Sequence, residues 1–276
     1  MSNSFLFIIP LTPCRLLTEN RKKLRSICLK TLTSQTYPNW KALLIGSELP
    51  DGFSGGNFIH LSYEGYKEEK LQKATQYILS NPLKPDYIIR LDDDDIFNPE
   101  LLDQLKNLTF DLYVDKYHTF WNSSDGSISQ KIFYWFPNTC IHKAEHALQR
   151  YGNLPPGNYE RFKTNALLIE NEHNDFHKYY TIDHKIRFSS KQDPVYLRAL
   201  NPDSITSIEQ VGDFKNYLDR HGYRKKNNLP AFRFLNGIVS EKTNGSLRGQ
   251  GLLFLIRQTV QNIRALLNYN KVVLYK

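Results

Sequence analysis

The sequence has few cysteines and no long apolar run. Its three cysteines are widely spaced and form no CxxC pair, which argues against a disulfide framework or a cysteine zinc site and favours a reducing compartment. No stretch approaches the roughly 18 apolar residues of a membrane span. The apolar run Phe5–Ile9 is too short for a signal peptide and has no basic residues before it. We therefore expect a cytoplasmic protein.

Acidic residues are missing from the end of the chain. No Asp or Glu follows Glu241, although six Lys or Arg residues do, in a chain whose net charge is +8. This asymmetry predicts an anionic partner, either a membrane surface, a nucleic acid or a phosphorylated substrate. From Leu252 to Leu267 apolar residues recur at helical spacing, with only basic charges on the other faces. Such a helix lies either at an anionic membrane surface or against the body of the protein.

The first half of the 276-residue chain alternates strand and helix patterns. A hydrophobic content of 40% indicates a folded globular protein with a sizeable core. Strands that alternate with helices imply a parallel sheet with helices on both faces, and ligands bind beyond the carboxyl ends of such strands. The pattern predicts strands over residues 5–9, 40–46, 58–61 and 87–91, and helices over 21–32, 66–79 and 100–108.

The second half is less regular and contains no internal repeat. A hairpin is expected across residues 122–126, between two of the predicted strands. The remaining patterns predict strands over residues 111–117, 131–136 and 195–199, and helices over 144–151, 161–176, 214–221 and 252–269.

Four consecutive aspartates, Asp92–Asp95, follow the apolar strand that ends at Leu91. Their mutual repulsion would destabilise the fold unless cations or hydrogen-bond donors offset it. A hard divalent cation with oxygen ligands does so directly. Because side chains alternate along extended backbone, Asp92 and Asp94 should face one way and Asp93 and Asp95 the other. The alternative is a solvated acidic turn that caps the helix starting near Pro99.

The segment Leu91–Glu100 resembles the Leu-Asp-x-Asp-Asp-x-x-x-Pro-Glu signature of family 2-type glycosyltransferases of the GT-A fold. Phe5–Pro10 is similar to the first nucleotide-binding strand of that family. Leu29–Trp40 resembles the stretch that joins its first helix to its second strand. The Arg-Leu-Asp-Asp-Asp-Asp sequence is particularly similar to the rhamnosyltransferase branch. The resemblance covers roughly residues 4–110 well and is weak beyond them.

This resemblance implies an α/β, Rossmann-like, mostly parallel sheet flanked by helices, with a C-terminal helical extension. Residues 1–115 would form the nucleotide-sugar-binding half, residues 116–210 the acceptor-binding half and residues 211–276 the basic helical extension. Asp92 and Asp94 would hold the metal and the diphosphate, supported by Asp95. The expected donor contacts are Pro10, Thr12, Arg15, Arg90 and Asp93. Family members usually carry acidic residues after the second strand, where this chain offers Glu48.

The implied chemistry is transfer of a sugar from a UDP- or dTDP-sugar to a glycan or lipid-linked glycan. Mn²⁺ or Mg²⁺ would stabilise the charge that develops on the departing diphosphate. An inverting enzyme also needs a carboxylate to deprotonate the acceptor hydroxyl, and Glu172, Asp175 and Asp183 are the candidates. His184 is the preferred histidine for a metal or phosphate contact. The biological setting implied is surface polysaccharide assembly, with peripheral contact to an anionic membrane.

Two other functions are weighed against this one. A nucleotidyltransferase would normally have a Gly-rich phosphate loop after its first strand, but Pro10–Arg15 contains no glycine. A basic nucleic-acid-binding protein would explain the charge, yet no helix-turn-helix, zinc finger or RNP-like motif appears. We therefore expect no nucleic-acid partner.

Overall fold

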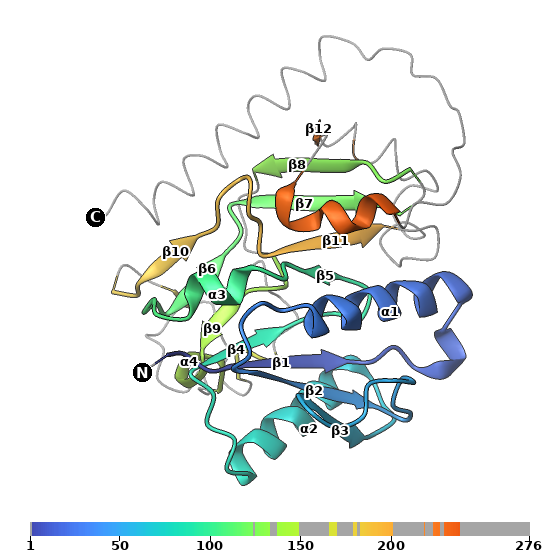
Figure 1. The fold of residues 1–276 in the computed structure, drawn as a ribbon. Coiled ribbons are helices and arrows are strands. Elements are labelled where there is room, and N and C mark those ends of the chain that lie inside the picture. The colour runs from blue at the N-terminus through green and yellow to red at the C-terminus, as the bar shows by residue number, and fades with distance from the viewer. Residues whose placement is uncertain are drawn as a thin grey trace.

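The computed structural model describes residues 2–123, 125–132, 137–148, 166–169, 179–180, 183–200, 218, 223–226 and 229–237. These residues form two sheets, with helices packed against the larger one (Figure 1). Among them, no helix is both long and apolar enough to cross a membrane.

The larger sheet has the strand order β10-β6-β9-β4-β1-β2-β3, in which only β9 runs against its neighbours. Its strands are β1 (Phe5–Pro10), β2 (Trp40–Gly46), β3 (Phe58–Ser62), β4 (Tyr87–Arg90), β6 (Leu112–Val114), β9 (Ile141–Lys143) and β10 (Ile186–Phe188). The four strands predicted in the first half are confirmed. Because β1 and β4 are parallel neighbours, Pro10 and the acidic run leave the sheet at the same edge.

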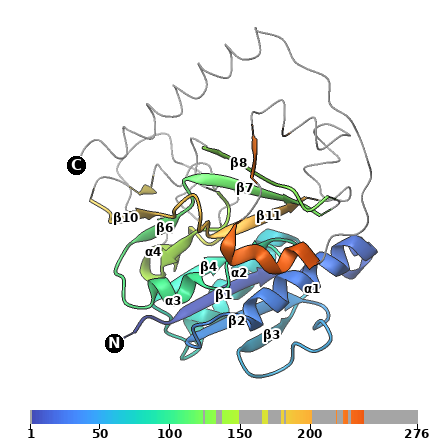
Figure 2. The same ribbon diagram turned by 45° about the horizontal axis from the view of Figure 1, so that its top comes forward.

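Helices α1 (Glu19–Thr33) and α2 (Lys67–Ser80) cover opposite faces of this sheet (Figures 1 and 2). Side chains alternate along β1, so Phe5 and Phe7 pack in the core that contains α1, whereas Leu6 and Ile8 pack in the core that contains α2. A mostly parallel sheet flanked by helices, the predicted fold class, is therefore confirmed.

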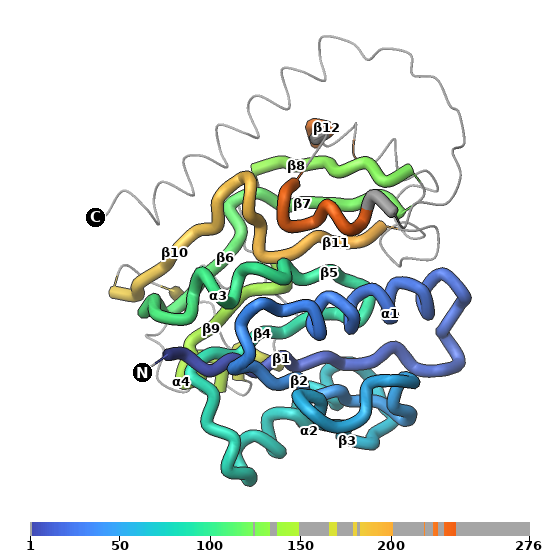
Figure 3. The backbone as a smooth tube through the Cα atoms, viewed as in Figure 1, coloured from blue at the N-terminus to red at the C-terminus, as the bar shows by residue number. Residues whose placement is uncertain are grey.

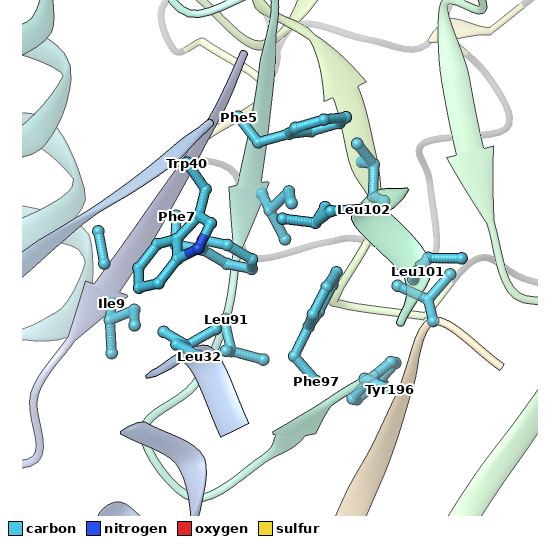
Figure 4. Packing of buried hydrophobic residues seen from close by; sticks show 14 of the residues in the cluster. Phe5, Phe7, Ile9, Leu32, Trp40, Leu91, Phe97, Leu101, Leu102 and Tyr196 are labelled. Atoms are coloured by element: carbon cyan, nitrogen blue, oxygen red, sulfur yellow. The ribbon is translucent and has the colours of Figure 1, made fainter. Parts of the chain in front are cut away.

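The core beside α1 is rich in aromatic rings (Figure 4). Phe7 contacts Phe97 edge to face at 4.8 Å between ring centroids and Trp40 at 6.0 Å. Phe97 is the second residue after the acidic run, and the short helix α3 (Leu101–Leu105) packs beside it. The chain on both sides of the aspartates is thus anchored in the core, which holds the run in place.

A second sheet of five strands has the order β12-β8-β7-β11-β5. Its strands are β5 (Ile96–Phe97), β7 (Tyr117–Asn122), β8 (Ile128–Ile132), β11 (Tyr196–Leu200) and β12 (Arg224–Lys226). Strands β7 and β8 form the predicted hairpin. β5 pairs with β11, so a strand from late in the sequence lies beside the end of the acidic run (Figure 3). The 3₁₀ segment Pro230–Gly237 packs between this sheet and α1.

Several predicted elements differ from the structure. The expected strand over residues 111–117 is divided into β6 and β7, because the chain leaves the strand at the buried Asp115 and bends at Lys116. The helix expected over 161–176 is wrong where the chain is described, since Ala166–Ile169 form a bridge residue and a turn. α4 (Ala144–Leu148) is a short helix within the predicted range. The helices expected over 214–221 and 252–269 lie, apart from Leu218, outside the described residues, and Arg224–Lys226 form a strand.

Asp115 fastens the segment before β11 to the end of β6. Its carboxylate accepts hydrogen bonds from the Ser189 hydroxyl and, at 2.7 Å, from the Val195 backbone N–H. Burial nevertheless raises the pKa of Asp115 to about 7. The carboxyl therefore holds its proton at a higher pH in the folded chain than in the unfolded chain.

We expect this group to make unfolding depend on pH. Because the folded state binds the extra proton, the free energy of unfolding should fall as pH rises from about 4 to about 7, by up to about 1.4 kcal/mol per pH unit. Asp115→Asn should flatten that slope, measured by urea unfolding at several pH values. Asp125→Asn, in an exposed turn, is the matched control. Equal slopes for Asp115→Asn and the wild type would contradict the assignment.

Candidate functional site

A cleft of about 370 Å³ lies where β1 and β4 end. Its volume is within the range of small-molecule sites. It is formed by five segments, namely the loop after β1, the starts of α1 and α2, the acidic run and β11. The lining residues are Pro10, Leu11, Thr12, Pro13, Arg15, Leu16, Arg21, Gly65, Tyr66, Lys67, Lys70, Asp92, Asp93, Asp94, Asp95, Arg198 and Ala199.

The carboxylate of Asp93 is occupied by contacts within the protein. Its carboxylate accepts from the Thr12 backbone N–H at 2.8 Å, from the Thr12 hydroxyl at 2.7 Å and from Arg25 Nε at 2.7 Å. The Arg25–Asp93 ion pair is largely buried, with side chains 10% and 6% exposed. Asp93 therefore fixes the loop after β1 against α1, rather than presenting a free carboxylate to a ligand as the sequence led us to expect.

Asp92 faces the opposite wall of the cleft. Lys67 Nζ lies 2.6 Å from Oδ1 and 2.7 Å from Oδ2, and Asn138 Nδ2 donates to Oδ2 at 3.1 Å. Burial alone would raise the pKa of Asp92, but Lys67 and Arg90 outweigh it and lower the pKa to about 2. Asp92 is therefore an anion at any physiological pH.

Asp94 and Asp95 sit in the field of the other two aspartates. Burial, followed by the charges of Asp93 and Asp92, raises the pKa of Asp94 to about 6. Burial and the charges of Asp94 and Asp92 likewise raise the pKa of Asp95. The Asp95 backbone N–H donates to the Asp92 carbonyl at 3.1 Å, which closes the run into a tight turn. A cation bound here would offset the repulsion that raises both pKa values.

The donor set suits a hard divalent cation. Mg²⁺ and Mn²⁺ prefer oxygen ligands, and Mg²⁺ typically takes one or two carboxylates together with substrate phosphates. Asp92 and Asp94 line the cleft, while Asp93 is held by Arg25. The run is a tight turn rather than an extended segment, and all four aspartates line the cleft, so the alternation expected from the sequence does not apply. Asp92 and Asp93 nevertheless have different partners, Lys67 and Arg25. A metal completed by phosphate oxygens fits this arrangement of residues.

The remaining predicted donor contacts lie in three different places. Pro10, Thr12 and Arg15 line the cleft as expected. Arg90 is buried below the run, where its charge lowers the pKa of Asp92. Glu48 is exposed beyond the end of β2 and is not part of the cleft lining.

The structure does not bring Asp183 or His184 to the acidic run. Both precede β10, whose partner β6 runs parallel to β4. They therefore lie at the amino-terminal edge of the sheet, whereas the aspartates lie at its carboxyl-terminal edge. The ring of His184 packs 5.0 Å from that of His146 and 5.3 Å from that of Tyr180. The other two candidate bases, Glu172 and Asp175, lie outside the described residues.

That amino-terminal edge carries a separate polar cluster. Ligand atoms of Asp111, Glu145 and His146 lie within 4.8 Å of one another, as metal ligands might be spaced. Lys143 Nζ, however, lies 2.6 Å from Glu145 and 4.0 Å from Asp111. An ammonium group already neutralises this cluster, which is best described as an ion-pair network.

Apart from Arg15, the cations of the cleft were not expected from the sequence. Lys67 and Lys70 begin α2 directly after Gly65, and their spacing of three residues places them on one face of that helix. Arg25 stands between Leu24 and Ile27 on the buried face of α1, and that position was the available signal for a buried ion pair. Arg198 reaches the cleft only because β11 pairs with β5, which no local pattern indicates.

Comparisons with known proteins give distant likenesses only. No family model and no curated protein matches the chain. Among solved structures, TarS 1–349 from S. aureus is similar over 72% of this chain and 61% of its own, with 14% identity and a TM-score of 0.44. A longer S. aureus TarS structure matches over 79% and 42%, with 16% identity and a TM-score of 0.44. The apo-form glycosyltransferase GlyE from Streptococcus pneumoniae matches over 68% and 46%, with 14% identity and a TM-score of 0.36.

Proposed function

We propose that the chain is a metal-dependent glycosyltransferase that takes its sugar from a nucleotide-sugar. The observation that carries the proposal is one cleft, at the carboxyl ends of parallel strands, that holds Asp92 and Asp94 together with basic side chains from four other segments. A site with both charges suits a metal-bound diphosphate, because the carboxylates hold the cation and the basic groups hold phosphate oxygens. The resemblance of Leu91–Glu100 to the glycosyltransferase signature supports the same conclusion.

The chain's own residues supply binding and charge. Arg15 and Arg21, from the loop after β1 and the start of α1, line the same cleft as Lys67 and Lys70. Lys70 Nζ is held behind the loop by the Leu11 carbonyl at 2.7 Å. Arg15, Arg21 and Lys67 would attract the donor diphosphate and stabilise the negative charge that it gains as the glycosidic bond breaks. The metal, Mn²⁺ or Mg²⁺, would act as a Lewis acid toward that leaving group.

The finer assignments rest on the sequence resemblance. We propose an inverting reaction with a UDP- or dTDP-sugar donor, with rhamnose among the candidate sugars, and a glycan or lipid-linked glycan acceptor of a surface polysaccharide. Glu172 and Asp175 remain the proposed bases. The basic helix predicted over residues 252–269 would hold the enzyme against an anionic membrane.

The test is a thermal unfolding screen with UDP- and dTDP-sugars, each with and without Mn²⁺. A ligand that binds only the folded state adds about 2.7 kcal/mol at 100 times its Kd. We expect one nucleotide-sugar to raise the Tm, and to do so only when Mn²⁺ is present. UMP with Mn²⁺ is the control, since it lacks the diphosphate. If no nucleotide-sugar shifted the Tm while duplex DNA did, the proposal would give way to nucleic-acid binding.

A further inference from the structure

The ion pairs of the acidic run are of two kinds. Arg25–Asp93 is buried, and Arg25 Nε, Thr12 N and the Thr12 hydroxyl all bind the same carboxylate. The Lys67–Asp92 pair lies in the cleft instead, and its side chains are 38% and 28% exposed. The Arg25–Asp93 pair is therefore a buried structural ion pair. The Lys67–Asp92 pair can separate with the loss of only one, partly exposed ion pair.

Lys67 occupies both oxygens of the carboxylate that a metal would need. Its Nζ lies 2.6 and 2.7 Å from the two Asp92 oxygens. A divalent ion that binds Asp92 must therefore displace the ammonium group, or bind beside it against its repulsion. Lys70, three residues later on α2, is not comparable, because it is buried and donates to the Leu11 carbonyl.

A diphosphate in the cleft would remove this obstacle. Lys67 is the first residue of α2, and its flexible four-carbon side chain lies on the cleft wall with Tyr66 and Arg15. A phosphate oxygen can replace Asp92 as the partner of Lys67, and other phosphate oxygens can complete the shell of the metal. Each charged group then exchanges one partner for another and none is left unpaired.

We propose that Lys67 is a positioning residue that makes metal and nucleotide binding depend on each other. This inference rests on the proposed function of the cleft. Lys67 blocks Asp92 in the nucleotide-free protein, so the metal alone binds weakly. The diphosphate draws Lys67 away and the metal takes its place on Asp92. By linkage, the metal strengthens nucleotide binding by the same factor.

The experiment compares the wild-type chain with Lys67→Met, Lys67→Arg and Lys73→Met. Lys73 lies on the exposed face of α2, so its substitution removes the same charge from the same helix outside the cleft. Mn²⁺ binding without nucleotide is measured by the electron paramagnetic resonance of free Mn²⁺. UDP and dTDP binding is measured by calorimetry with and without Mn²⁺. Thermal unfolding of each variant confirms that it is folded.

We expect Lys67→Met to bind Mn²⁺ alone about tenfold more tightly than the wild type, within the usual range of coupling between sites. The gain in nucleotide affinity that Mn²⁺ provides should shrink by the same factor. Lys67→Arg and Lys73→Met should bind Mn²⁺ alone as the wild type does. If Lys67→Met bound Mn²⁺ no better than Lys73→Met, while the wild type bound nucleotide and metal together, the role of Lys67 would be refuted. If the wild type bound neither nucleotide, even with Mn²⁺, the proposed function itself would fail.

Discussion

Asp94→Asn should abolish sugar transfer and leave the fold at least as stable as in the wild type. Asp94 lines the cleft beside Asp92, and in the proposed reaction it is a ligand of the metal. Loss of the metal contact should lower the transfer rate by at least about 10³-fold, which corresponds to about 4 kcal/mol of transition-state stabilisation. The rate is measured as release of the nucleoside diphosphate from the donor identified in the thermal screen.

The stability of this variant separates a functional role from a structural one. Burial, Asp93 and Asp92 raise the pKa of Asp94 to about 6, so its charge opposes folding at neutral pH. Removing that charge should keep or raise the Tm. Asp103→Asn is the control, because Asp103 pairs with Lys106 on α3 outside the cleft. Near wild-type activity in Asp94→Asn would mean that the metal role has been assigned to the wrong residue.

Arg25→Met should be strongly destabilising, because it leaves the buried carboxylate of Asp93 without its cation. Breaking a buried ion pair from one side typically costs about 3–5 kcal/mol. The loop after β1 should also loosen, since Asp93 binds both the backbone N–H and the hydroxyl of Thr12. The free energy of unfolding is measured by urea titration.

Two variants make the Arg25 result specific. Lys22→Met removes an exposed ion pair with Glu19 on the same helix, and such solvent-exposed pairs contribute little to stability. The double variant Arg25→Met, Asp93→Asn should regain part of the lost stability, because the unpaired charge is gone. An Arg25→Met protein as stable as Lys22→Met would show that the pair does not hold the loop.

Local patterns were sufficient for the half of the larger sheet that contains β1 to β4. Phe5–Pro10 and Trp40–Gly46 are short apolar runs with clear turn residues after them, and such runs form buried parallel strands whatever follows them. The acidic run after Leu91 predicted the position of the cleft, because residues that follow a central strand must lie at the end of that strand.

Prediction failed where distant residues decide the structure. Asp115 divides a predicted strand because its carboxylate binds Ser189 and the Val195 N–H, both more than seventy residues away. His184 seemed a plausible ligand because of its neighbours in sequence, but the parallel pairing of β10 with β6 places it at the other edge of the sheet. Hydrogen bonds and strand pairing across such distances leave no periodic signal in the chain.

The acidic run is also one of the covalent links between the two sheets, along with Asp115–Lys116 and Ser189–Val195. β4 ends at Arg90 in the larger sheet and β5 begins at Ile96 in the smaller one, next to the strand that brings Arg198 into the cleft. A rotation of one sheet against the other would displace the two ends of this short acidic segment relative to each other. The distances between the carboxylates would then change with such a movement. A ligand that bound between the two sheets and changed the angle between them would therefore alter the affinity of the proposed cation site without contacting the cation.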